Sequence, residues 1–157
     1  TDDADVFAVV RLFSSDDNEV VFQGAVDPYT PIAQGWLRAS HRELDNELTE
    51  PWRPYHSHTR EELLQPGEIV ELDIEIWPTS IVIPKGYYLV LSIQGRDYEC
   101  PDAKPQMLSN FKNQLTGCGP FLHNDPIDRN ERFNGKTTVH FGEGKLPHLL
   151  LPIIPKK

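Results

Sequence analysis

The residues best suited to bind a metal ion are His56 and His58, which stand two positions apart. On a strand, positions two apart lie on one face, so both imidazoles could bind the same ion. No third ligand is close in the sequence, and His123, Asp125 or His148 would have to approach in the folded chain. The alternative is two histidines that hydrogen-bond backbone groups in an extended segment. The sequence favours this alternative, and we expect no metal and no cofactor.

A second polar group is His123-Asn-Asp-Pro126, which is followed by Asp128 and Arg129. Asp125 and Asp128 could bind calcium together with backbone carbonyl oxygens. However, aspartate before proline favours a turn in which the carboxylate accepts nearby backbone N–H groups. We therefore predict that these residues order a loop.

No serine has the surroundings of a catalytic nucleophile, because none lies in a G-x-S-x-G elbow between a strand and a helix. Ser57 stands between two histidines, but adjacent residues on a strand point to opposite faces. The acids Glu71, Asp73 and Glu75 would share the solvated face of a strand, where they favour solubility and oppose edge pairing. A glycosidase pair is a poorer interpretation. The chain alone is thus predicted to be non-catalytic. Its serines are Ser14, Ser15, Ser40, Ser57, Ser80, Ser92 and Ser109.

The aromatic residues admit two interpretations. Trp36, Trp52 and Trp77, with Tyr29 and Tyr55, could line a sugar-binding face. They could equally belong to a domain interface, where aromatic residues and arginine are enriched. Arginines at 38, 42 and 53 lie nearby in the sequence and favour the interface. The candidate interface residues are Trp36, Arg38, His41, Tyr55, His56, His58 and Trp77.

The elements that would position these residues are strands. Over 70–76, four aliphatic residues alternate with three acids, which predicts a strand with one buried face. Trp77-Pro78 ends this strand, because proline cannot donate to a ladder. A turn then leads to a strand over 87–94, which we expect to lie beside 70–76. Its buried residues would be Leu89, Leu91 and Ile93.

Further strands are predicted over 6–13, 20–25, 136–142 and 148–154. Residues 6–13 are apolar on both faces, which indicates a central strand with cover on both sides. With 20–25 they should form a hairpin.

The segments between the strands are less regular. Residues 34–40 are amphipathic without a clear period, 41–50 could form one or two helical turns, and the prolines of 50–58 favour an extended backbone. Residues 98–134 lack periodicity and predict a long irregular loop of the kind that is often functional. The sequence predicts one all-β domain, an antiparallel sandwich or jelly roll.

Composition excludes some partners. The chain has 157 residues, with 15 Lys and Arg against 24 Asp and Glu, a net charge of −9. This charge opposes binding to nucleic acid or to an anionic membrane, and no apolar run of about 18 residues is present. Cys100 and Cys118 lack a zinc or thioredoxin spacing. Reduced thiols are favoured over a disulfide, which slightly favours the cytoplasm.

The order of several motifs resembles the C-terminal domain of the cocaine-esterase-like and X-Pro dipeptidyl-peptidase-like hydrolases, the CocE/NonD family. The motifs are Gln34-Gly-Trp-Leu-Arg-Ala-Ser-His-Arg42, Tyr55-His-Ser-His58, Leu64-Gln-Pro-Gly-Glu68, Glu75-Ile-Trp-Pro-Thr79, Pro84-Lys-Gly86, Phe121-Leu-His-Asn-Asp-Pro126 and Leu149-Leu-Leu-Pro152.

The resemblance implies a galactose-binding-domain-like jelly roll over residues 1–157. In the family this domain is non-catalytic, packs on an α/β-hydrolase domain that carries the catalytic residues, and helps to wall its cleft. The family's domain normally begins with further strand sequence, so we expect the jelly roll here to lack one or two N-terminal strands. The expected partners are the hydrolase domain of the same parent or a second copy of the chain. A carbohydrate-binding module is the alternative function.

Overall fold

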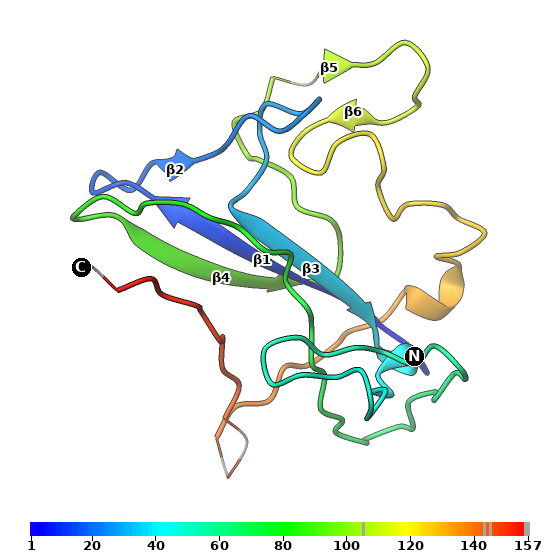
Figure 1. Ribbon diagram of the computed structural model, residues 1–157. Coiled ribbons are helices and arrows are strands. Elements are labelled where there is room, and N and C mark those ends of the chain that lie inside the picture. Colours follow the sequence, from blue (N-terminus) through cyan, green and yellow to red (C-terminus); the bar gives the residue numbers. More distant parts are fainter. Residues whose placement is uncertain (105, 143, 145, 156–157) are drawn as a thin grey trace.

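The computed structural model describes residues 1–104, 106–142, 144 and 146–155. Within these residues the chain is mostly β and contains no α-helix, only two short 3-10 helices (Figure 1). A four-stranded antiparallel sheet forms the centre, and a two-stranded hairpin lies apart from it. The elements are β1 (Asp5–Phe13), β2 (Glu19–Val20), β3 (Ala33–Arg38), η1 (Ala39–His41), β4 (Tyr88–Gln94), β5 (Gln106–Met107), β6 (Gln114–Leu115) and η2 (Glu131–Phe133).

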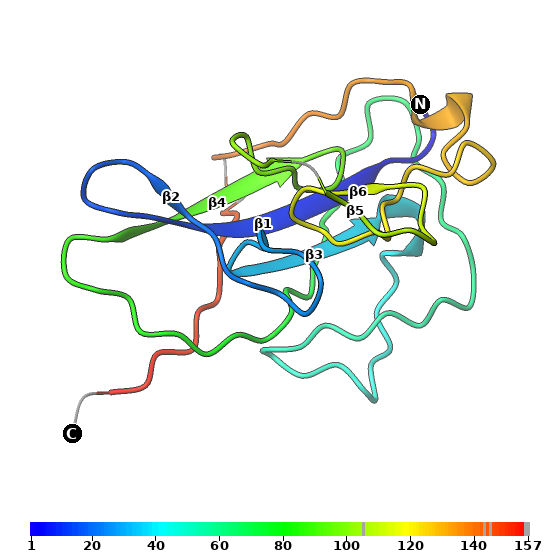
Figure 2. The ribbon, with the colours of Figure 1, turned by 90° about the horizontal axis from the view of Figure 1, so that it is seen from above.

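Strand β1 is central, as predicted. It pairs antiparallel with β3 from Asp5 to Val10 and with β4 from Phe7 to Phe13. Both of its faces are covered, because five consecutive residues from Val6 to Val10 are buried. On one face, Val10 packs with Ile32 and Ala33 in the hydrophobic core. The other face carries Phe7 and is covered by the segment that contains Tyr98 and His123 (Figure 2).

The predicted hairpin over 6–25 is present, but its second strand is short. Strand β2 pairs only Leu12 with Val20 and Phe13 with Glu19. Beyond it, Phe22 forms an isolated bridge with Thr30. Residues 34–40, whose type the sequence left open, form most of β3 and the start of η1.

One helical turn forms within 41–50, at the lower end of the one or two turns that the sequence predicted. The 3-10 helix η1 ends at His41, and after it a single turn is closed by the N–H of Thr49, which donates to the Asp45 carbonyl. The extended backbone predicted for 50–58 is interrupted at a turn and again at His58, whose φ is 51°. Glu50 and Arg53 exchange both backbone hydrogen bonds and form a tight turn.

The alternation of residues 70–76 correctly predicts which side chains are exposed. The predicted strand, and its pairing with the strand over 87–94, were wrong. The four aliphatic side chains are partly buried and the three acids are exposed. However, this segment forms no strand, and β4 pairs with β1 instead. The expected burial on β4 was also wrong for two residues, because Leu91 is 40% and Ile93 is 42% exposed.

The segment 75–77 passes along β3 at very short range. A Cβ added to Gly35 would lie 1.9 Å from the carbonyl oxygen of Glu75. The N–H of Trp77 donates to the Gln34 carbonyl at 3.0 Å. Ile76 packs against the core cluster, whereas the next residue, Trp77, packs on Trp36. Gly35 therefore permits the approach that brings these two tryptophans together.

The strands predicted over 136–142 and 148–154 are not formed. Leu149 packs against the core cluster, but most apolar side chains of this part of the chain are exposed, including Phe141, Leu150, Ile153 and Ile154. The chain is irregular here (orange and red in Figure 1). Alternation alone did not produce strands, because no strand in the described part of the chain pairs with either segment.

Residues 98–134 are irregular apart from the hairpin of β5 and β6 and the helix η2. Cys100 and Cys118 are free thiols. Burial raises the pKa of Cys118 to about 12, and its thiol donates to the side-chain oxygen of Gln34. Among the residues described, no helix is long and apolar enough to span a membrane.

We predict that Gly35→Ala lowers the free energy of unfolding by about 2 to 3 kcal/mol, because the new methyl group would collide with a backbone carbonyl that cannot rotate away. Urea denaturation of the chain measures the change. Gly95→Ala is the matched control, since a Cβ there meets nothing within 4 Å. It should change the stability by less than about 0.5 kcal/mol. Equal effects at the two positions would contradict the close approach.

Candidate functional site

A cleft of about 600 Å³ lies over the outward face of β1 and β3. Its floor follows from the register of the two strands, which places Asp5 opposite Arg38 and Phe7 opposite Trp36. Its lining residues are Asp5, Phe7, Trp36, Leu37, Arg38, His41, Pro54, Tyr55, His56, His58, Glu75, Trp77, His123 and Asp128. We call this site the Trp36 cleft.

All seven candidate interface residues line the Trp36 cleft. They come from β3, from η1, from the segment 54–58 and from the end of the segment 70–77. The other lining residues were not predicted as members of this site: Asp5, Phe7, Leu37, Pro54, Glu75, His123 and Asp128. The first two could have been found only from the β1–β3 register, which the sequence did not supply.

Aromatic rings form one wall of the cleft. The rings of Trp36 and Trp77 lie 5.2 Å apart at their centroids, and the His123 ring lies 4.7 Å from that of Trp36. Trp36 remains 37% and Trp77 58% exposed. Trp52, which is 72% exposed, does not line the cleft. Two large apolar side chains thus remain available to a binding partner.

Arg38 joins three parts of the chain at the cleft. Its guanidinium donates to both carboxylate oxygens of Asp5 on β1 and to both of Asp128 in the 123–129 loop, at 2.8 to 3.2 Å. The guanidinium carbon Cζ of Arg38 lies 4.5 Å from the centroid of the Phe133 ring. The hydrogen bonds from Arg38 hold the pKa of Asp128 below its usual range. The Arg38–Asp128 pair therefore stabilises the fold at pH values above the pKa of an aspartate in the unfolded chain. This stabilisation is lost as the pH falls through the lowered pKa of Asp128 in the folded chain.

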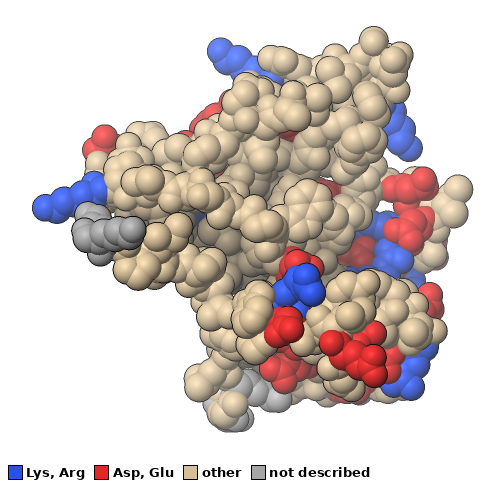
Figure 3. Space-filling view, viewed as in Figure 1, with Lys and Arg blue, Asp and Glu red and all other residues tan. Residues whose placement is uncertain are grey.

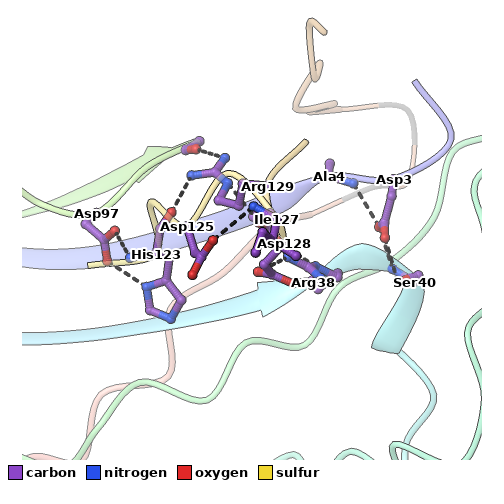
Figure 4. A network of polar contacts seen from close by, with 12 residues as sticks. Asp3, Ala4, Arg38, Ser40, Asp97, His123, Asp125, Ile127, Asp128 and Arg129 are labelled. Atoms are coloured by element: carbon purple, nitrogen blue, oxygen red, sulfur yellow. Dashed lines mark hydrogen bonds and ion pairs between the residues drawn. The ribbon is translucent and has the colours of Figure 1, made fainter. Parts of the chain in front are cut away.

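The 123–129 loop is ordered by further polar contacts (Figure 4). His123 Nδ1 lies 2.8 Å from Asp97 Oδ1, and the His123 backbone N–H donates to the other oxygen of Asp97. Arg129 donates to the carbonyl groups of Gly95 and His123. Its Nε lies 3.1 Å from Asp5, an ion pair without the alignment of a hydrogen bond.

The turn predicted at Asp125 is confirmed. Its carboxylate accepts the N–H of Ile127 at 2.9 Å, and its carbonyl accepts the N–H of Arg129. Asp128 is occupied by Arg38. The two aspartates are thus used within the protein, as the loop-ordering hypothesis requires.

The Asp97–His123 pair has the arrangement of a base held by a carboxylate, which in serine hydrolases activates a hydroxyl. The lining of the Trp36 cleft contains no serine, threonine or cysteine. A nucleophile for acyl transfer would therefore have to come from outside the cleft. What the site offers is a face of aromatic, histidine and carboxylate groups suited to binding.

Three histidines gather at one end of the cleft. His58 Nδ1 lies 3.2 Å from His41 Nδ1, and the rings of His56 and His58 are 6.1 Å apart at their centroids. The partner closest to the H-x-H pair is thus His41, and none of the third ligands considered from the sequence joins it. Across the described part of the chain, no group of three or more metal-ligating side chains is present. Burial, and then the neighbouring His58, lowers the pKa of His56.

The position of His41 depends on a buried contact at the chain's start. The Asp3 carboxylate is buried and accepts the N–H of Ala4 together with the N–H and hydroxyl of Ser40 (Figure 4). Ser40 lies in η1, directly before His41. This contact fixes the 3-10 turn that presents His41 to the cleft.

The sequence of the X-Pro dipeptidyl-peptidase C-terminal non-catalytic domain matches residues 1–149. The chain belongs to this family. The resemblance predicted from the motifs is confirmed, and so is the predicted role of a non-catalytic C-terminal domain of these hydrolases.

Several proteins similar to this chain are named as hydrolases. The chain is 36% identical over 101 residues to proteins assigned as serine esterases, Mb1866c of Mycobacterium bovis and MT1883 of Mycobacterium tuberculosis. These matches cover 57% of this chain and 16% of each relative. The crystal structure of the CocE/NonD family hydrolase SACOL2612 of Staphylococcus aureus is similar with a TM-score of 0.59 and 36% identity, over 60% of this chain and 17% of that one. The matched part of this chain thus spans about a sixth of each relative's length.

We predict that Arg38→Lys destabilises the domain by about 1 to 3 kcal/mol, because an ammonium group cannot form paired hydrogen bonds with two carboxylates. Urea denaturation measures this loss. Hydrogen exchange should also become faster in the 123–129 loop. Arg96→Lys is the control, since the exposed Arg96 side chain has no ion pair within the described structure. A loss of stability without faster exchange in the loop would show that Arg38 does not order it.

Proposed function

We propose that the chain is the jelly-roll C-terminal domain of a CocE/NonD-type serine hydrolase, and that it packs on the α/β-hydrolase domain of the same parent through the Trp36 cleft. The observation that carries this proposal is the convergence of seven candidate interface residues from separate segments on one cleft. In this arrangement the domain stabilises the catalytic domain and helps to shape its substrate cleft.

The chemistry of the cleft supports an interface with another domain. Its exposed groups include Trp36, Tyr55 and Trp77, and aromatic residues concentrate where proteins bind one another. A volume of about 600 Å³ can admit several side chains from a partner. The charged groups Asp5 and Asp128 are already paired with Arg38, and Asp5 also with Arg129, so covering the cleft costs less than burying unpaired charges would.

Uncovered apolar residues support the jelly-roll part of the proposal. Leu91 and Ile93 on β4, and Phe141 and Ile153 in the C-terminal segment, are exposed side chains of segments with strand-like alternation. Figure 3 shows that much of one face is uncharged, whereas Asp and Glu gather at its lower right. We infer that further strands of the sandwich form when the parent, or a second copy of the chain, covers these residues.

The substrate of the parent is left to its hydrolase domain, since the cleft offers no nucleophile of its own. Acyl esters, Xaa-Pro peptides and β-lactam precursors all lie within the range that the family resemblance implies.

We predict that Trp36→Ala and Trp77→Ala each weaken the packing of the two domains in the intact parent, because a buried interface tryptophan typically contributes about 2 kcal/mol or more. Calorimetry of the parent should show the domains unfolding at more widely separated temperatures. The KM of the parent for its ester or peptide substrate should rise.

The matched control is Trp52→Ala, because Trp52 is more exposed than either and lies outside the cleft. It should leave both measurements unchanged. If all three variants behave alike, the Trp36 cleft is not the docking surface.

A carbohydrate-binding module is a second candidate function, because sugars bind to exposed aromatic rings and Trp36, Trp52 and Trp77 are all exposed. Titration of the chain with a panel of oligosaccharides distinguishes the two functions. Saturable binding that Trp36→Ala abolishes would favour the carbohydrate module, and flat titrations would remove it.

A further inference from the structure

We propose that His41 and His58 form a two-histidine clamp for a divalent transition-metal ion of the zinc class. The two side chains come from separate segments, one at the end of η1 and the other from the 54–58 region, and both line the Trp36 cleft. The sequence favoured no metal because the H-x-H pair has no nearby third ligand. In the structure, the histidine that pairs with His58 is His41 and not His56, and sequence spacing could not reveal this pair.

The distance between the two rings fits a shared ion. His41 Nδ1 and His58 Nδ1 face one another at 3.2 Å. Two imidazole nitrogens bound to one tetrahedral zinc ion at about 2.0 to 2.1 Å would lie about 3.3 Å apart. The observed separation is that of a hydrogen bond between the two imidazoles and is close to the separation in such a site, so an ion could replace this hydrogen bond with little movement of the rings. The ring centroids lie 5.2 Å apart, with the planes tilted by 47°.

The backbone holds both ligands on a common support. Glu43, two positions after His41, accepts hydrogen bonds from the hydroxyl groups of Ser57 and Thr59, which flank His58. The N–H of Ser57 also donates to the Glu43 carbonyl at 3.0 Å. His58 itself has a φ of 51°, a left-handed conformation that residues other than glycine seldom adopt. A residue held in this way is fixed by its neighbours rather than by its own preference.

The ligand type selects the ion. Imidazole nitrogens suit zinc, copper and nickel, whereas calcium and magnesium prefer oxygen ligands. The clamp supplies two ligands, and the other positions are open to water or to a donor group from a partner. Such an ion would link the 54–58 region to η1 and stiffen this end of the cleft. The clamp is a property of this chain and does not depend on the proposed docking.

The test is isothermal titration of the full chain with zinc chloride at pH 7.5 in a buffer that does not chelate metal. We expect one ion to bind per chain. His41→Ala and His58→Asn should each weaken binding by at least tenfold. Asparagine is chosen at position 58 because it tolerates the left-handed backbone, so the fold should be kept, and circular dichroism checks this. His148→Ala, which removes an exposed histidine outside the cleft, is the matched control and should bind as the unchanged chain does.

A second readout separates the clamp from nonspecific binding to carboxylates or thiols. Protonated imidazole cannot bind metal, so the affinity should fall between pH 7.5 and pH 5.5, whereas carboxylate ligands stay ionised over this range. Cobalt substituted for zinc should show the visible spectrum of nitrogen ligation and not that of sulfur ligation, which distinguishes the clamp from thiols. The clamp is overturned if no saturable binding occurs, or if His41→Ala and His58→Asn bind zinc as tightly as His148→Ala. Either result would leave the docking through Trp36 and Trp77 untouched.

Discussion

The rest of the structure depends on the need to cover both faces of β1. Because this strand is apolar on both sides, neither face can be left to solvent without losing the burial that stabilises the sheet. One face is covered by the core cluster around Val10, to which Ile76 and Leu149 contribute from distant segments. The other face is covered by the segment that contains Tyr98 and His123. The Trp36 cleft lies on this second face, next to the covering segment.

The cleft is therefore a consequence of how the strand is covered. Gly35 lets the 75–77 segment approach β3 closely, which places Trp77 on Trp36. Arg38 connects Asp5 beneath the cleft to Asp128 at its rim. Asp3 fixes the turn that carries His41. Aromatic and histidine side chains are thus presented on a rigid base, as a docking surface requires.

The sequence predicted what depends on local pattern and missed what depends on partners. The central position of β1 was predicted because its apolar residues occupy both faces, and the alternating exposure of 70–76 followed from a period of two. Strands over 136–142 and 148–154 were predicted wrongly, since a strand needs a neighbouring backbone that periodicity does not provide. In the site, Trp36 and Arg38 were predictable together because residues two apart on a strand share a face. Asp5 joins them only through the pairing of β1 with β3, and His123 only through the packing of its loop, and neither can be read from local pattern.

The most direct measurement of the central claim is amide hydrogen exchange in this chain alone and within the intact parent. If the Trp36 cleft docks on the hydrolase domain, the cleft walls at 54–58, 75–77 and 123–128 should exchange more slowly in the parent. The amide of the exposed Gly67, in a turn outside the cleft, should exchange at the same rate in both. Equal exchange at the cleft walls in the two proteins would contradict the account.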